Sequence, residues 1–268
     1  MFTDSHCHLT FPELAGDMPG VRAAMAAARV TRALCISTTM EEFPSVQALA
    51  TEYDNFWASA GVHPDSEDVH EPSVAELVAA TQMPKVVAIG ETGLDYYQME
   101  ERKGGRRIAD MEWQRERFRT HIRAARQVGV PLVIHTRAAS DDTLAILREE
   151  GEQGGAGSAG GVFHCFTETR EVARAALDLG FYVSLSGIVT FKNARELHEV
   201  ATLIPCDRLL IETDSPYLAP VPYRGKINTP AYVPHVAARL AELRGTSAEH
   251  IGELTSANFT RLFKRVAS

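Results

Sequence analysis

Short apolar runs alternate with longer amphipathic stretches along the whole chain. The short runs are rich in β-branched and aromatic residues and have the length of buried strands; they are Phe2–Cys7, Arg32–Ser37, Phe56–Val62, Val86–Glu91, Pro131–His135, Gly161–His164, Phe181–Leu185 and Leu209–Glu212. The stretches between them carry apolar residues at helical spacing, as in Gly20–Arg29, Trp113–Val128, Glu171–Leu179 and Ala231–Leu243. Because parallel strands need crossover helices, this alternation predicts a parallel α/β fold.

The number of strands selects among parallel folds. Eight strands close a barrel, so we expect a (β/α)₈ barrel of the TIM type. An open doubly wound sheet is the alternative, but no GxGxxG turn follows the first strand. The chain shows no internal repeat or linker, and its 268 residues suit one barrel, so residues 1–268 are predicted to form a single domain.

Local signals mark the end of the chain and two loops. Thr246 and Glu249 have capping-box spacing, which predicts a final helix whose apolar face carries Ile251, Leu254, Leu262 and Phe263. Two glycine-rich loops are Glu101–Arg107 and Gly154–Gly161. In a barrel the first would lie on the catalytic face and the second on the opposite face.

Charge and cysteine usage narrow the class of protein. The formal net charge of −8 argues against a surface-wide basic footprint for duplex binding, although a local basic patch remains possible. The four cysteines, Cys7, Cys35, Cys165 and Cys206, form no CxxC pair and are predicted to be buried thiols. With no leader-like start and no long apolar run, we expect a reduced, cytoplasmic protein with neither a membrane nor an obligate protein partner.

Ionisable residues gather where the predicted strands end. Eight of them stand at the last residue of a strand run or just beyond it: His6, His8, His63, Glu91, His135, His164, Glu212 and Asp214. The carboxyl ends of barrel strands meet at one mouth, where barrel active sites are built. The other histidines, His70, His121, His198, His235 and His250, fall in helical or loop segments and are expected on the surface.

The residue types at these strand ends are those of a metal centre. His6 and His8 are two apart on a strand and point to the same face, so they could chelate one ion. Glu91 ends an otherwise apolar run, where a carboxylate is costly to bury unless it is paired or bound to metal, and its two oxygens could bridge two ions. His135 and His164 each supply a further imidazole.

Three more strand-end residues are assigned less uniquely. Asp214, directly after an apolar strand, could bind one ion and accept a proton from an attacking water. Glu212 could support a ligand histidine or form a salt bridge within the barrel. His63 could contact a substrate phosphate, hold a further ion, or be structural.

Several motifs together resemble the TatD family of metal-dependent deoxyribonucleases, in the amidohydrolase superfamily. The motifs are DSHCHL, GVHP, GETGLDYY, VIHTR, GVFHCF, SLSGIVTFKNA, LLIETDSPYLAP and YRGKINTPAYV, and the match runs nearly end to end, from Asp4 to Phe263. The resemblance implies a (β/α)₈ fold, two or three divalent ions such as Mg²⁺, Mn²⁺ or Zn²⁺, and hydrolysis of DNA, often as an exonuclease. It places the metal ligands on the same six residues: His6, His8, Glu91, His135, His164 and Asp214.

The chain departs from the family pattern at a few positions. Thr92 stands where the family commonly has Ile, Ala138 where it often has Asp, and Ile227 where it often has a basic or polar residue. The loop Glu101–Arg107 is also longer and more basic than the resemblance implies. These departures concern substrate choice and leave every predicted ligand in place.

The expected function is therefore a metal-dependent hydrolase, most simply a deoxyribonuclease in which Glu91 bridges two ions and Asp214 orients the attacking water. Substrate contacts are expected from loop residues, namely Arg102, Lys103, Arg106 and Arg107 after the fourth strand and Tyr223, Arg224 and Lys226 after the eighth, with Tyr96, Tyr97 or Tyr223 available to stack a base. One alternative is a small-molecule amidohydrolase or esterase with the same metal pair. Another is a non-catalytic metal-binding protein, which would be expected to have lost a ligand.

Overall fold

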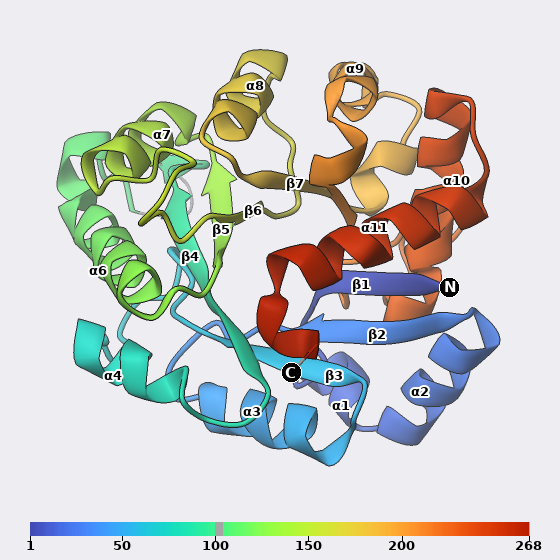
Figure 1. Cartoon of the computed structure of the whole chain (residues 1–268), viewed down its shortest axis with the longest axis horizontal. Coiled ribbons are helices and arrows are strands. Elements are labelled where there is room, and N and C mark those ends of the chain that lie inside the picture. The colour runs from blue at the N-terminus through green and yellow to red at the C-terminus, as the bar shows by residue number, and fades with distance from the viewer. Residues whose placement is uncertain (100–103, 268) are drawn as a thin grey trace.

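The computed structural model describes residues 1–99 and 104–267, and its strands form one parallel sheet in chain order (Figure 1). The strands are β1 Phe2–Cys7, β2 Val30–Cys35, β3 Phe56–Ala60, β4 Val86–Asp95, β5 Leu132–Arg137, β6 Gly161–Phe163, β7 Tyr182–Leu185 and β8 Leu209–Ile211. Each pairs in parallel with the next, as the alternating pattern predicted. The sheet curls into a nearly closed barrel, and the (β/α)₈ prediction is confirmed.

Helices surround the sheet on its outer side (Figure 1). In the described residues they are α1 Pro12–Ala15, α2 Met18–Ala27, α3 Phe43–Glu52, α4 Val74–Ala80, α6 Glu112–Val128, α7 Ser140–Glu149, α8 Arg170–Asp178, α9 Arg195–Leu203, α10 Val233–Arg244 and α11 Ala248–Leu262. Short 3₁₀ turns occupy Ile108–Met111, Gly187–Thr190, Cys206–Arg208, Pro230–Tyr232 and Lys264–Ala267.

The seam of the barrel is closed by the segment that follows β8. The backbone N–H of Asp214 donates to the His6 carbonyl at 3.0 Å, and that of His8 donates to the Ser215 carbonyl at 2.8 Å. The buried Asp4 carboxylate accepts hydrogen bonds from the Thr213 backbone and hydroxyl. Pairing across the seam therefore carries Asp214 directly to the end of β1, beside the two histidines.

Apolar packing fills the barrel interior and blocks its amino end. Phe259 and Phe263, from the end of α11, belong to the same buried cluster as inward-pointing strand residues such as Trp57 and Val133. Figure 1 shows α11 lying across this end of the barrel, close to β1. The carboxyl ends of the strands are thus the open end at which a site can form.

The predicted capping box of the last helix is wrong. Ser247, not Thr246, is the N-cap residue, and its hydroxyl accepts a hydrogen bond from the backbone N–H of His250. Because α11 begins one residue later than the box requires, Glu249 is free to pair with Arg29 on the surface. One side-chain acceptor still satisfies a helix N–H, which is what a cap must do.

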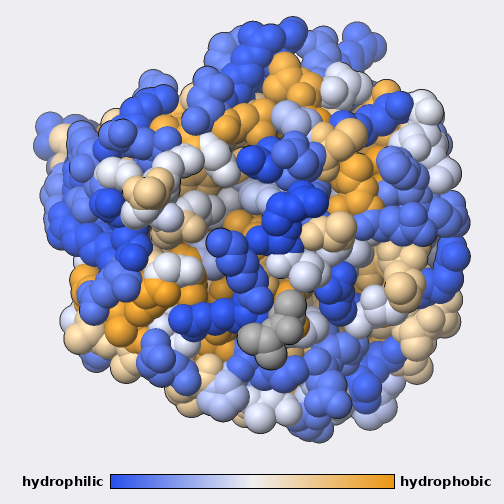
Figure 2. Space-filling model, in the orientation of Figure 1, coloured by the Kyte–Doolittle hydropathy of each residue, from blue (hydrophilic) through white to orange (hydrophobic). Residues whose placement is uncertain are grey.

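No helix in the described part of the chain is both long enough and apolar enough to cross a bilayer. On the face shown in Figure 2, hydrophilic side chains are interspersed with small apolar patches.

Strand β4 continues four residues beyond its predicted end at Glu91. A register irregularity between Ile89 and Thr92 keeps the polar segment paired with β5, so that Gly93 lies opposite His135. A Cβ at Gly93 would stand 1.9 Å from the His135 carbonyl oxygen, and its φ of 127° also disfavours other residues. The close approach of these two strands therefore requires glycine.

Replacing Gly93 with Ala is expected to lower the free energy of unfolding by about 2 kcal/mol or more, from overpacking and backbone strain together. Urea unfolding monitored by circular dichroism measures this. The matched control is Gly129→Ala, which also changes a positive-φ glycine but whose Cβ would meet nothing within 4 Å. A Gly93→Ala protein no less stable than this control would contradict the close-approach argument.

Candidate metal centre and active-site cavity

The buried Glu91 carboxylate has five histidines within 3.8 Å, namely His63, whose Nε2 is 3.5 Å from Oε1, and two pairs, one toward each oxygen. Its Oε1 lies 2.7 Å from His164 Nε2 and 3.3 Å from His135 Nδ1. Its Oε2 lies 3.4 Å from His6 Nε2 and 3.8 Å from His8 Nε2. The structure therefore brings residues from β1, β4, β5 and the end of β6 together, with one oxygen of Glu91 toward each pair.

Asp214 completes the group that contains His6 and His8. Its Oδ1 is 3.6 Å from His6 Nε2 and 3.4 Å from His8 Nε2, and those two nitrogens are 3.2 Å apart. Asp214 reaches this position with a left-handed backbone, at φ 55°, immediately after β8. All six residues that the sequence marked as ligands thus lie around one point of the barrel mouth.

This donor set fits divalent metal ions. Ligands that bind one Zn²⁺ tetrahedrally at about 2.0–2.1 Å stand roughly 3.3 Å from one another, close to the separations among His6, His8 and Asp214. His164 Nε2 is buried and makes no hydrogen bond, although it faces a carboxylate oxygen. A cation bound by both His164 Nε2 and Glu91 Oε1 would stabilise a lone pair in this position. His6, His8 and Asp214 form one possible ion-binding group, and His63, Glu91 and His135 form another.

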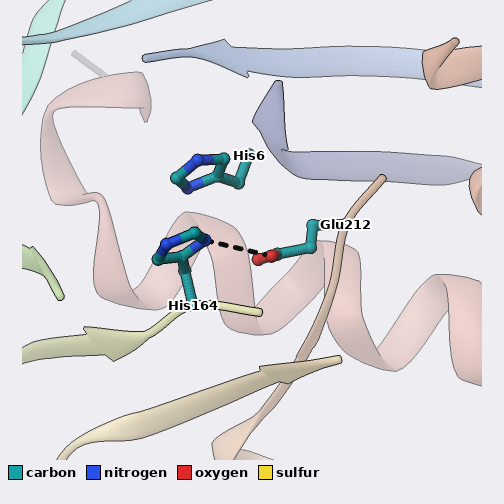
Figure 3. A group of neighbouring side chains, drawn as sticks. All are labelled: His6, His164 and Glu212. Atoms are coloured by element: carbon teal, nitrogen blue, oxygen red, sulfur yellow. Dashed lines mark hydrogen bonds and ion pairs between the residues drawn. The ribbon is translucent and has the colours of Figure 1, made fainter. Parts of the chain in front are cut away.

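Two carboxylates stand behind the histidines and orient their rings. Glu212 Oε1 lies 3.3 Å from His164 Nδ1 and also accepts the backbone N–H of Cys165 at 2.7 Å. Figure 3 shows His164 in contact with Glu212, with the His6 ring stacked on the His164 ring. The two ring centroids are 3.8 Å apart. Asp95 Oδ2 lies 3.1 Å from His135 Nε2. Each carboxylate accepts a hydrogen bond from one ring N–H, which leaves the lone pair of the opposite nitrogen toward Glu91.

Asp95 was not among the predicted site residues, because the predicted strand ended at Glu91. A signal was present nonetheless. Residues four apart on one strand point to the same face, so Asp95 could have been placed beside Glu91 had GETGLD been interpreted as strand. Glu212, by contrast, was identified, and its position behind His164 favours the supporting role over a salt bridge elsewhere in the barrel.

The electrostatics of the cluster favour added positive charge. Burial opposes ionisation of Glu91, but His164, His63 and His6 outweigh it and hold the Glu91 pKa well below its usual range. Burial likewise opposes protonation of His164, but Glu91 and Glu212 raise the His164 pKa well above its ordinary value. The carboxylates thus favour positive charge at this position, which a bound cation would supply.

A cavity of about 660 Å³ opens above this cluster. Its floor includes Glu91 and Asp214, and its walls include the aromatic rings of Phe11 and Tyr217. Among its described lining residues Arg137 is the one lysine or arginine, and its guanidinium lies 3.6 Å from the centre of the Tyr97 ring. The cavity thus combines an anionic, histidine-rich floor with aromatic and cationic side chains.

The basic loop residues that the structure describes do not line this cavity. Arg106 forms a two-bond ion pair with Glu67, at 2.7 and 2.8 Å, and Arg107 pairs with Asp110. Arg224 lies 4.2 Å above the Phe191 ring, and Lys226 lies 5.9 Å from the Tyr223 ring. Arg102 and Lys103 fall outside the described residues. A role for these loops in substrate binding stays a prediction.

Each of the three candidate stacking tyrosines has at least one face of its ring covered by other side chains. Tyr96 is buried and donates its hydroxyl proton to Asp142, so the prediction that it could stack a base is wrong. Tyr223 stacks on Tyr232, with ring centroids 4.0 Å apart. The Arg137 guanidinium covers one face of Tyr97.

Two burial predictions also fail. His121, expected on the surface, is fully buried on the inner face of α6, where its Nε2 accepts the backbone N–H of Val62 at 3.0 Å. Cys206, expected to be buried, is exposed, and Cys165 is half-buried, whereas Cys7 and Cys35 are buried. All four thiols are free, as the absence of paired spacing indicated.

Known proteins similar to this chain include metal-dependent hydrolases and members of the TatD family. The family described as TatD related DNase matches residues 3–264. An uncharacterized metal-dependent hydrolase, YcfH of Escherichia coli (strain K12), is 47% identical over 99% of this chain and 96% of its own length. The 3'-5' ssDNA/RNA exonuclease TatD of Klebsiella pneumoniae (strain 342) is 34% identical over 97% of each chain. The crystal structure of YJJV, a TatD homolog from Escherichia coli K12, superposes with a TM-score of 0.87 at 29% identity and covers 98% of both chains.

Fold, site and relatives together define a metal-dependent hydrolase built on a parallel α/β barrel. Within that class, the chain belongs to the TatD family.

Proposed function

We propose that this chain is a nuclease that hydrolyses DNA phosphodiester bonds with two divalent ions, Mg²⁺, Mn²⁺ or Zn²⁺, held on either side of Glu91. The observation that carries the proposal is the division of the Glu91 carboxylate between two groups of donors. Two-metal sites with a shared ligand are common in enzymes that cleave phosphate esters. The name of the Klebsiella relative, an exonuclease, points to the same substrate class.

The residues divide between the two ions according to geometry. His6, His8, Asp214 and Glu91 Oε2 would hold one, and His135, His164 and Glu91 Oε1 the other. When bound, such ions lower the pKa of a water and neutralise charge on the phosphoryl oxygens.

Asp214 is the proposed proton acceptor. It lies in the cavity floor, and although burial opposes its ionisation, the hydrogen bond from His8 and the charge of His6 lower its pKa. The carboxylate is therefore ionised at neutral pH and can orient a water and take its proton. Attack of that water on phosphorus breaks one P–O ester bond, so that one product carries a phosphate monoester and the other a hydroxyl.

The direct test is incubation of metal-loaded protein with end-labelled single- and double-stranded DNA, with products sized over time. We expect progressive shortening that stops when a chelator is added. If DNA stays intact while carboxylic esters or lactones are cleaved, the proposed nuclease is wrong and a small-molecule hydrolase takes its place.

Arg137 is expected to contact substrate phosphate, because it is the cation in the cavity wall and its guanidinium is held flat against Tyr97. Replacing Arg137 with Ala should raise KM for single-stranded DNA about tenfold and reduce the slope of log affinity against log salt by about 0.7, the value for one phosphate contact. The matched control is Arg123→Ala, because that guanidinium is paired with Glu150 through two hydrogen bonds and does not line the cavity. Equal effects of the two substitutions would contradict a specific role for Arg137.

A further inference from the structure

His63 lies beside the metal centre but differs from His135 and His164 in the partner of its other ring nitrogen, which is a backbone N–H and not a carboxylate. It follows β3, and its Nε2 stands 3.5 Å from Glu91 Oε1, within the group of atoms that could bind an ion with His135. Its other nitrogen, Nδ1, accepts the backbone N–H of Asp65 at 3.0 Å. A neutral imidazole has one N–H and one lone pair, so the proton of His63 is on Nε2 and points toward the cavity.

His135 and His164 have the opposite arrangement. Their outward nitrogens face the carboxylates Asp95 and Glu212, each of which accepts a hydrogen bond from the ring N–H, so the lone pair is on the nitrogen that faces Glu91. A metal ion binds the lone pair of a neutral imidazole, not its N–H. His63 therefore presents a donor where its two neighbours present acceptors.

We propose that His63 is a hydrogen-bond donor to a phosphoryl oxygen of the substrate and not a metal ligand, and that Arg117 is the positioning residue that holds it there. The first part rests on the proposed phosphodiester substrate. A fixed N–H beside the ions would interact most strongly with the phosphoryl oxygens as they gain charge in the transition state. His63 lines the cavity with 21% of its side chain exposed, and its Nε2 lies 3.5 Å from Glu91 Oε1 at the same place, within reach of a substrate bound above Glu91.

Arg117 fixes the backbone that carries His63. Its side chain is buried on the inner face of α6, and its Nη1 donates to the carbonyl of His63 at 2.7 Å and to that of Ser66 at 2.8 Å. Glu71 pairs with the remaining edge of the guanidinium. These bonds hold both ends of the turn from His63 to Ser66. Within that turn the Asp65 N–H donates to His63 Nδ1 and so fixes the tautomer of the ring. Arg117 therefore determines the tautomer by holding the turn in place.

His121 supports the same segment from one helical turn further along α6. Its Nδ1 donates to the Arg117 carbonyl at 2.8 Å, and its Nε2 accepts the backbone N–H of Val62 at 3.0 Å. Burial lowers the pKa of His121 to about 4, so the ring stays neutral and keeps the lone pair that this bond needs. The backbone before and after the His63 Cα, at the Val62 N–H and the His63 carbonyl, is thus hydrogen-bonded to two side chains of α6.

The test that does not depend on substrate is ¹⁵N NMR of the histidine rings together with metal analysis. We expect His63 to show a protonated Nε2 and an unprotonated Nδ1, both without metal and after titration with Zn²⁺. The variant His63→Leu should bind as many ions per chain as the parent, whereas His135→Leu should bind fewer. Loss of the Nε2 proton on metal addition, or loss of an ion in His63→Leu, would overturn the proposal.

Kinetics then test the donor role. His63→Leu should lower kcat for DNA by roughly 10–100-fold, the range for a hydrogen bond to a charged group, with little change in KM. His63→Gln, whose amide can place an N–H near the position of Nε2, should recover part of that loss. Equal activity of the parent and His63→Leu would refute the donor role.

A double-mutant cycle tests Arg117. If Arg117 acts through His63, Arg117→Met should lower kcat in the parent but cause no further loss in the His63→Leu background. Arg117→Lys, which cannot hold two carbonyls and Glu71 at once, serves the same cycle if the Met variant fails to fold. Additive losses would show that Arg117 acts independently of His63. If the parent cleaves no DNA, the nuclease proposal fails, while the NMR and metal-binding results still decide whether His63 is a ligand.

Discussion

Replacing Glu91 with Gln is expected to lower phosphodiester hydrolysis by about 10³-fold or more and to reduce the number of divalent ions bound per chain. Loss of an outer partner of a metal ligand costs roughly 10–100-fold, and Glu91 would contact both ions directly. An amide has one acceptor oxygen, so its NH₂ group would face either the His6 and His8 nitrogens or those of His135 and His164. One of the two donor groups would therefore lose its bridging oxygen whichever way the amide turns.

Metal analysis and DNA hydrolysis are measured on the same preparation. The matched control is Glu152→Gln, because Glu152 is also fully buried and accepts two backbone N–H groups at the opposite end of the barrel, before β6. That variant should lose stability but keep its ions. A Glu91→Gln protein that binds metal and cleaves DNA like the parent would rule out the bridging role.

The fold and the central cluster were accessible from sequence for one physical reason. Parallel strands need helical crossovers, and their carboxyl ends meet at one mouth, so strand-end residues such as His135 and His164 could be grouped without knowing any distance. What failed depended on strand length and irregular pairing. Asp95 was missed because β4 continues through a polar, glycine-containing segment whose pairing with β5 leaves no apolar signal.

Ion pairs between residues far apart in the sequence could not be predicted from the sequence either. Arg106 appeared free in a basic loop, but its partner, Glu67, comes from the connection after β3. His121 was assigned to the surface by residue type, although Phe118 and Ile122 beside it on α6 mark the same buried face. The burial of His121 could have been predicted from helical periodicity, whereas the pairing of Arg106 with Glu67 could be known only from the tertiary structure.

Asp214→Asn is expected to lower turnover by about 10²–10⁴-fold, the scale for loss of a general base. The substitution suits a test of charge because asparagine, like aspartate, tolerates the left-handed backbone that Asp214 adopts at φ 55°. The matched control is Asp68→Asn, an exposed position with nearly the same backbone, φ 56°, where activity should equal that of the parent.

Metal content separates the two roles proposed for Asp214. Its Oδ1 faces His6 and His8, so loss of its charge can weaken an ion as well as remove a proton acceptor. If the ligand role dominates, Asp214→Asn should bind fewer ions at low metal concentration and regain turnover as metal is raised to saturation. If the proton-acceptor role dominates, turnover should stay low with both ions bound, because an amide cannot take the proton from water. Turnover equal to that of the Asp68→Asn control at every metal concentration would remove Asp214 from the chemistry altogether.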